Sequence, residues 1–289
     1  MKVADLSSYL LHPLPDQDNL TRTLSGCDHQ GRHVSVEVVT ERGMTLYLNK
    51  QEIVTLMTLG DHPRYLAVGF LLNQKMLMAD DLIIDVDVDD DLGVMIVRTK
   101  RQTNYEDKLQ RKIRTSGCAQ GTLFGDLMEK FADIKLVTNV HIRTSWLYKL
   151  LQHINTTPSI YQKAGAIHGC VLCQQGRPLL YMEDVGRHNA IDKIAGYMHL
   201  HNMTSENKIF YTTGRLTSEM VIKTVQMGIP ILVSRSGFTA WGVELARQVG
   251  LTLIGRARGR QFTVMSGAQR LVYDADSGSG KHVSHQVRE

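Results

Sequence analysis

The chain has 289 residues, of which 43% are hydrophobic, and it carries a formal net charge of +4. This composition is typical of a globular protein with one large or two small domains, and four cysteines are too few for a disulfide scaffold. The weak positive charge, and the absence of a stripe of alternating basic and aromatic residues, argue against a nucleic-acid partner. No apolar run approaches the ~20 residues of a membrane span, and the first residues lack the apolar core of a signal peptide. We therefore expect a cytoplasmic protein with no membrane or nucleic-acid partner.

The N-terminal part of the chain is predicted to be rich in strands. Residues 1–33 are polar, contain prolines and glycines, and indicate an irregular arm. Residues 33–39 alternate between apolar and polar side chains, as a half-buried strand does. Residues 44–48 and 53–57 predict a hairpin that turns at Asn49 and the following lysine.

A helix and two further strands complete this N-terminal subdomain, to which we assign residues 34–115. Asp61 is a candidate N-cap for the helix, and Pro63 suits its first turn. Val86 and Val88, which alternate with aspartates, and the apolar residues 94–97 predict the strands.

The second half of the sequence predicts an α/β domain over residues 116–273, followed by a loose tail at 274–289 that is rich in Gly, Ser and His. After residue 158 come two strands separated by a turn signal at 174–176. From Lys208 strands and helices alternate with short links, which predicts a parallel sheet with right-handed crossovers. The strands are predicted at 167–172, 179–182, 209–212, 230–233 and 251–254, and the helices at 122–131, 145–154, 190–195, 218–227 and 240–249.

Cys118 is the first candidate for chemistry. It lies between Gly117 and Gly121, directly behind a tract from Arg98 to Arg114 that contains seven basic and two acidic residues. A cysteine reacts as its thiolate, which nearby positive charge favours, and the glycines allow the backbone to bend freely. The local sequence is equally compatible with a reactive cysteine and with an inert thiol in a loop.

Three loops in the second half predict an anion site. In open α/β sheets ligands bind beyond the carboxyl ends of the strands, where loops 213–217, 234–239 and 255–260 are expected to meet. These loops are rich in glycine, arginine and hydroxyl groups, and helix N-termini with nearby arginines bind phosphate. The alternative is that the glycines only form turns and the arginines only face water. No Walker lysine loop or dinucleotide fingerprint is present.

A Cys-x-x-Cys sequence follows His168. Cys170 and Cys173 are compatible with zinc or with a redox pair, and either could act as a resolving thiol for Cys118. A structural zinc needs four ligands, however, and the two side chains of a strand at this spacing point to opposite faces. We therefore favour two buried cysteines and expect no structural metal.

A dense group of charges lies around the start of the helix predicted at 190–195. It contains Glu183, Asp184, Arg187, His188 and Asp192, and His188 is suited either to acid–base chemistry or to a structural pair with a carboxylate. Because charged turns are common, the sequence slightly favours the structural network.

The sequence resembles the formate dehydrogenase accessory sulfurtransferase family (FdhD/NarQ). The most specific match is Glu183-Asp184-Val185-Gly186-Arg187-His188-Asn189-Ala190-Ile191-Asp192-Lys193, which is close to a family signature. Further similar segments are 41–72, 116–118, 165–168, 213–215, 218–220 and 255–263.

The resemblance implies a cytidine-deaminase-like three-layer α/β sandwich with a smaller strand-rich N-terminal subdomain, paired as a homodimer. It also implies a sulfur relay, in which a cysteine desulfurase loads a persulfide onto Cys118. The sulfur then passes to the molybdenum bis(molybdopterin guanine dinucleotide) cofactor, bound as cargo, before that cofactor enters formate dehydrogenase. We expect cofactor contacts from Gly214, Arg215, Arg256, Ala257, Arg258, Gly259, Arg260 and Gln261, and auxiliary roles for His168, Asp184, Arg187 and His188.

The sequence departs from the family pattern in two places. Many members carry Cys-x-x-Cys in the active loop, whereas this loop has Cys118 and, three residues later, Gly121. Arg256 stands where members often have phenylalanine. We therefore expect an ionic contact, or stacking of the guanidinium group, in place of stacking of an aromatic ring. Because the loop has a single cysteine, an alternative function stays open, in which the protein is a non-catalytic chaperone that binds the cofactor and delivers it. The zinc motifs of the deaminases are absent, which argues against deamination.

Overall fold

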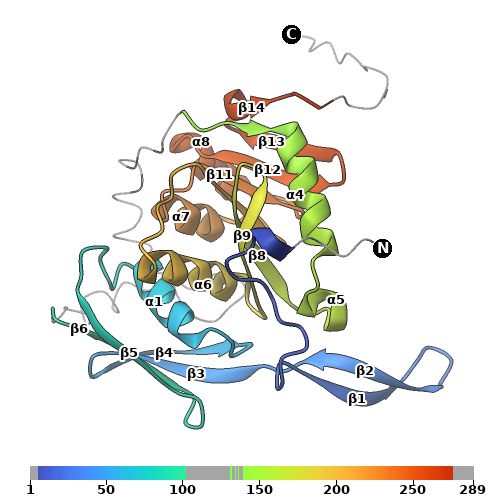
Figure 1. The fold of residues 1–289 in the computed structure, drawn as a ribbon, viewed down its shortest axis with the longest axis vertical. Helices are drawn as coiled ribbons and strands as arrows, with labels where there is room; N and C mark the ends of the chain where they lie inside the picture. Colours follow the sequence, from blue (N-terminus) through green and yellow to red (C-terminus); the bar gives the residue numbers. More distant parts are fainter. Residues whose placement is uncertain (1–5, 102–130, 132–133, 135, 137–138, 276–289) are drawn as a thin grey trace.

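The computed structural model describes residues 6–101, 131, 134, 136 and 139–275 (Figure 1). Cys118, most of the basic tract before it, nearly all of the helix predicted at 122–131 and the boundary predicted at residue 115 lie outside the described residues. In the part of the chain that is described, no helix is long and apolar enough to cross a membrane.

A six-stranded sheet forms the centre of the molecule, in the order β13-β12-β11-β10-β8-β9. Strands β10, β11 and β12 are parallel, as predicted, but β8, β9 and β13 are antiparallel to their neighbours. The parallel sheet predicted for the strands after residue 208 is therefore confirmed, and β8, β9 and β13 extend it in the antiparallel direction. Short turns at Gly176 and Gly259, both with positive φ, connect β8 to β9 and β12 to β13, and so short a connection returns the chain antiparallel. The strands are β8 His168–Gln174, β9 Arg177–Asp184, β10 Lys208–Thr212, β11 Ile231–Ser234, β12 Thr252–Arg258 and β13 Gln261–Ser266.

Helices cover both faces of this sheet and make three layers (Figure 1). Because side chains alternate along a strand, Cys170 and Leu172 pack beneath one helical layer, whereas Val171 and Cys173 pack beneath the other. The first layer contains α6 Arg187–Leu200, α7 Ser218–Gln226 and α8 Ala240–Gln248, and the second contains α4 Thr144–Thr156. The short α5 Ile160–Ala164 packs in a separate cluster, in which Ile160 joins Leu20 and Leu59.

The N-terminal subdomain is a four-stranded sheet, in the order β4-β3-β6-β5, packed on one helix, α1 Pro63–Asn73. The predicted hairpin is confirmed, and Asn49 takes the positive φ that its tight turn requires. Asp61 does not cap α1. His62 is the N-cap and makes no side-chain capping bond, while Asp61 pairs with Lys193 of α6. The strands are β3 Arg42–Leu48, β4 Gln51–Thr58, β5 Ile83–Asp89 and β6 Val94–Thr99.

The N-terminal arm is more ordered than predicted. Strand β1 (Thr21–Cys27) pairs antiparallel with β2 (His33–Val39), and the two form a ribbon that extends away from the body (Figure 1). The arm begins with a 3₁₀ turn, η1 (Leu6–Ser8), after which the Leu10 amide donates to the Leu179 carbonyl. Sequence reasoning missed β1 because its side chains are mostly polar and exposed, so it lacks an apolar pattern.

The start of the C-terminal tail is also fixed. Asp274 accepts hydrogen bonds from the amide and the hydroxyl of Ser145 at the first turn of α4, at 2.9 and 2.8 Å. A carboxylate is favourable at a helix N-terminus, which explains why this residue is held. Residues 276–289 lie outside the described part. The remaining elements are β7 Ile142–Arg143, η2 Ala268–Arg270 and β14 Leu271–Val272, which pairs with β7.

Helices α1 and α6 cross at two glycines and thereby join the N-terminal subdomain to the central sheet. A Cβ atom on Gly69 would lie 1.7 Å from the Asp192 carbonyl oxygen, and one on Gly196 would lie 1.9 Å from the Tyr65 carbonyl oxygen. Only glycine permits so close an approach of two helix backbones.

Candidate functional site

The three segments predicted as loops of an anion site lie side by side at one edge of the central sheet, although residues 255–258 of the third belong to strand β12. We call residues 213–217, 234–239 and 255–258 the rim. The Leu216 amide donates to the Gly237 carbonyl at 2.9 Å, and the Arg256 amide donates to the Ser236 carbonyl at 2.8 Å. The start of β8 and the end of β9 reach the same edge, because the Gly169 amide donates to Thr213 Oγ1 at 3.0 Å and His168 pairs with Asp184.

The N-termini of three helices lie at this edge. The N-caps of α6, α7 and α8 are Gly186, Thr217 and Thr239. Unpaired amides and the positive end of the helix dipole make each N-terminus favourable for an anion. The rim therefore combines several anion-favouring helix ends.

Arginines add positive charge to the rim. Arg187 is buried, and its aliphatic part packs on Gly214, where a Cβ atom would lie 2.8 Å from Arg187 Cδ. Arg215 and Arg256 are exposed, and Arg256 has a left-handed backbone (φ 54°). A non-glycine residue in this conformation carries some strain, which the bond from its amide to Ser236 helps to offset.

The two predicted histidines lie beside these arginines. His188 Nε2 is 3.1 Å from Glu219 Oε2 in the first turn of α7, and both side chains are nearly buried. Burial lowers the pKa of His188, and Glu219 opposes that shift. Burial also lowers the pKa of His168, with further lowering from the charges of Arg187, His188 and Arg215. Both shifts favour the neutral form of the imidazole.

Asp184 supports the site as a fully buried side chain, which a ligand at the rim does not reach. Its carboxylate accepts hydrogen bonds from Asn189 Nδ2 (2.9 Å) and from the Gly186 amide (3.1 Å), as well as from Thr58, and it lies 2.5 Å from Lys193 Nζ. Burial disfavours the charge of Lys193, but the two carboxylates, Asp184 and Asp61, outweigh it and raise the pKa of Lys193.

Sequence reasoning missed Lys193, Thr58 and Glu219 as supports of this edge. Lys193 did carry a signal, because a lysine among Ala190, Ile191 and Ile194 in a buried helix needs an acidic partner. Thr58 and Glu219 carried none, since nothing local distinguishes a buried threonine or a helix-start glutamate from an exposed one.

The segment predicted to contact the cofactor spans the end of β12 and the turn into β13. Arg258, Gly259 and Arg260 are exposed, but the Ala257 side chain is buried in the core and can offer a ligand only its backbone. The guanidinium of Arg260 lies 5.9 Å from the centre of the Tyr148 ring on α4, so this residue reaches the opposite helical layer.

Cys170 and Cys173 are both fully buried and pack on opposite faces of the sheet, as predicted. Burial raises the pKa of Cys170 to about 12 and that of Cys173 well above its ordinary value. Neither is suited to react as a thiolate, and the two do not point to a common metal. Within the described residues, no group of three or more His, Cys, Asp or Glu side chains is placed to hold a metal ion.

Comparisons with known proteins agree on one family. The model of the FdhD/NarQ family matches residues 39–272. The sulfur carrier protein FdhD of Bacillus subtilis is 28% identical over 84% of this chain and 94% of its own length. Its counterpart in Wolinella succinogenes is 29% identical over 81% of this chain and 82% of its own length.

A solved structure shows the same fold. The crystal structure of a formate dehydrogenase accessory protein from Desulfotalea psychrophila matches with a TM-score of 0.70 and 25% identity, over 87% of this chain and 98% of that one. The family match covers most of the sequence, and this chain belongs to the FdhD/NarQ family.

Proposed function

We propose that this protein is a sulfur carrier, acting as a sulfurtransferase in the maturation of formate dehydrogenase, with Cys118 as the carrier residue. Relatives that match over most of their length bear the name sulfur carrier protein, and the similar solved structure is of a formate dehydrogenase accessory protein. The observation that carries the proposal is the rim, where arginines and three helix N-termini meet at one edge of the sheet. Such a site suits the diphosphates of a dinucleotide.

The loading step that we propose is a transfer between two cysteines. The Cys118 thiolate attacks the outer sulfur of a persulfide on a cysteine desulfurase and forms a new S–S bond. The original S–S bond breaks, and the desulfurase cysteine leaves with the electron pair as a thiolate. No external oxidant or reductant is needed. The basic tract that precedes Cys118 in the sequence favours the attacking thiolate.

The cargo that we propose for the rim is the molybdenum bis(molybdopterin guanine dinucleotide) cofactor, which is the substrate that receives the sulfur. Gly214 makes room for the side chain of Arg187 beside the rim. Arg215, Arg256 and Arg258 supply exposed charge. His168 and His188 can supply hydrogen bonds or protons, while Asp184 and Arg187 hold the edge in place.

Three finer points belong to the same proposal. We infer that the α/β sandwich is of the cytidine-deaminase-like type, that two copies form a homodimer, and that the protein works in the cytoplasm. The three-layer arrangement supports the first point.

Complementation of a strain that lacks its own family member tests the carrier against a chaperone that only delivers the cofactor. A sulfur carrier requires Cys118, so Cys118→Ala should abolish formate dehydrogenase activity. A pure chaperone tolerates Cys118→Ala but loses function in Arg258→Ala. Full activity of Cys118→Ala would therefore refute the sulfur-carrier proposal.

A further inference from the structure

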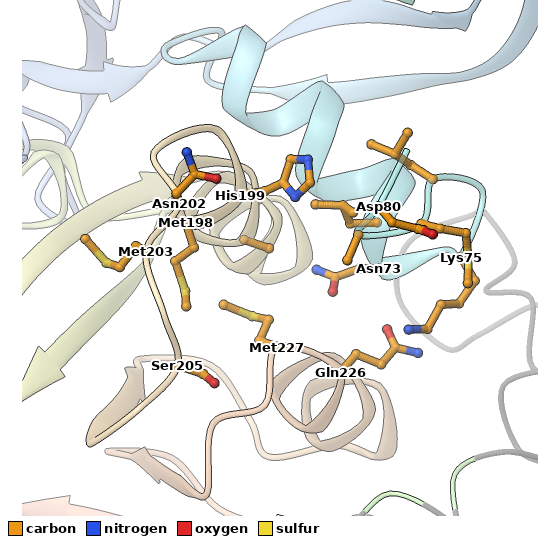
Figure 2. A pocket seen from close by; sticks show the side chains of 15 residues that line it. Asn73, Lys75, Asp80, Met198, His199, Asn202, Met203, Ser205, Gln226 and Met227 are labelled. Atoms are coloured by element: carbon orange, nitrogen blue, oxygen red, sulfur yellow. The ribbon is translucent and has the colours of Figure 1, made fainter. Parts of the chain in front are cut away.

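A pocket of about 550 Å³ lies at the far end of α6 and α7 from the rim (Figure 2). Its walls come from the C-terminal ends of α1, α6 and α7 and from the segments that follow α1 and α6. None of the residues proposed for sulfur transfer lines this pocket. Four methionines do, and they are Met78, Met198, Met203 and Met227.

The electrostatics of this pocket differ from those of the rim. Three helices present their C-terminal, partially negative ends, which disfavours an anionic ligand. Among the described residues of the lining, Lys75 and Asp80 carry the fixed charges, which are opposite in sign. Burial lowers the pKa of His199, so this side chain is disposed to be neutral. These features disfavour an anionic ligand, and an uncharged ligand avoids that cost.

One buried polar atom in the lining has no hydrogen-bond partner among the described residues. Gln226 Oε1 is shielded from solvent and accepts no hydrogen bond from the described residues. The neighbouring Asn73 is already fixed, because its amide donates to Asp192 at 2.6 Å and Asp192 in turn pairs with Lys223. A buried acceptor without a donor is costly, and a ligand that brings an N–H group removes that cost.

We propose that this pocket binds an uncharged aromatic heterocycle of one or two fused rings that donates an N–H hydrogen bond to Gln226 Oε1. Thioethers make favourable contacts with aromatic rings, and Figure 2 shows Met198, Met203 and Met227 on one side of the space with Asn73 and Gln226 opposite. The volume lies within the range of small-molecule sites. Because the pocket and the rim share no residue, this proposal stands or falls independently of sulfur transfer.

Methyl NMR of the full-length protein with ¹³C-labelled methionine tests the proposal, with benzimidazole as the probe. We expect benzimidazole to shift the methyl signals of Met198, Met203 and Met227 with a Kd on the order of 1 mM or tighter. The signals of Met57 and Met265, which do not line the pocket, should stay in place. Benzimidazole-5-carboxylate, which has the same rings and a negative charge, should bind at least about tenfold more weakly.

A second comparison isolates the hydrogen bond. Gln226→Met keeps the length of the side chain but removes the acceptor, and it should weaken benzimidazole about tenfold. The N-methyl derivative of benzimidazole has no N–H donor and should bind the parent and the variant equally. The proposal is overturned if the pocket methionines do not shift, if Met57 and Met265 shift as strongly, or if the carboxylate binds as well as benzimidazole. Equal binding of benzimidazole to the parent and to Gln226→Met would overturn the assignment of Gln226.

Discussion

Lys193 Nζ lies 2.5 Å from Asp184 Oδ2, and neither side chain has any exposed surface. The same amino group donates to the Glu183 carbonyl at 2.9 Å and pairs with Asp61, which precedes α1. One buried cation thus ties the end of β9 to the N-terminal subdomain. The edge of the sheet that carries the rim is fixed by this network.

Replacing Lys193 by methionine should destabilise the protein strongly. The change leaves Asp184 buried without its cation, which typically costs about 3–5 kcal/mol of unfolding free energy. Urea unfolding followed by circular dichroism measures the effect. Lys149→Met on the exposed face of α4 is the matched control and should change the stability by less than about 0.5 kcal/mol. A similar small loss in both variants would show that the network does not stabilise the fold.

Gly69→Ala should also destabilise the protein, although alanine is the better helix former by about 1 kcal/mol. The added methyl group would meet the Asp192 carbonyl of α6, and the helices would have to move apart. We expect a loss of roughly 3 kcal/mol or more in thermal or urea unfolding. Gly26→Ala in β1 adds the same group into open space and should be nearly neutral. An increase in the stability of Gly69→Ala would contradict the close crossing of α1 and α6.

Glu183 should make the stability depend on pH near neutrality. Burial raises its pKa from 4.5 to about 7, although its carboxylate accepts hydrogen bonds from the amides of Ile160 and Tyr161. Between these two pH values Glu183 is protonated in the folded state and ionised in the unfolded state. Its contribution to the free energy of unfolding therefore falls as the pH rises, and it levels off above about pH 7.

Glu183→Gln removes this titration and serves as the reference. Histidines with a lowered pKa, such as His168 and His188, contribute in the opposite direction, but they are common to both proteins and cancel in the difference. The stability of the parent minus that of the variant should decrease between pH 4.5 and 7, by a total on the order of 3 kcal/mol. A difference that is constant with pH would show that the pKa of Glu183 is not raised.

Much of the second half of the fold follows from the sequence, because its strands are apolar and its helices are separated by glycines. The alternation at Cys170 and Cys173 correctly predicted that they face opposite layers. Strands β8 and β9 were predicted, with a turn signal between them, but β13 was missed, because none of its residues is fully buried. Polar β1 was missed for the reason that its stability comes from pairing with β2 rather than from a buried face.

The candidate site was predicted unevenly. The convergence of the three loops follows from the rule for parallel strands, and the structure confirms it for β10, β11 and β12. The sequence slightly favoured a structural network for the charged turn that contains Asp184. Its partners Thr58 and Lys193 could not be predicted, because they are distant in the sequence or on another element. The proposed role of Cys118 stays a prediction, since that residue lies outside the described part of the chain.

Arg215 should contribute to binding a guanine nucleotide at the rim. It is exposed beside the N-terminus of α7, so its guanidinium can meet a diphosphate. We expect Arg215→Ala to weaken GDP about tenfold in calorimetry, and the affinity of the parent to fall as salt is added. Arg177→Ala, an exposed arginine at the opposite end of the sheet, should bind GDP as the parent does. Equal losses in the two variants would indicate a general effect of charge and not a site at the rim.

The most direct measurement for the account as a whole is the mass of the protein after incubation with a cysteine desulfurase and cysteine. We predict that the parent gains one sulfur atom, that a reductant removes it, and that peptide mapping places it on Cys118. Serine substitution of the buried Cys170 and Cys173 should leave the gain unchanged, whereas Cys118→Ala should abolish it. A Cys118→Ala protein that gains as much sulfur as the parent would contradict the proposal that this cysteine carries the sulfur.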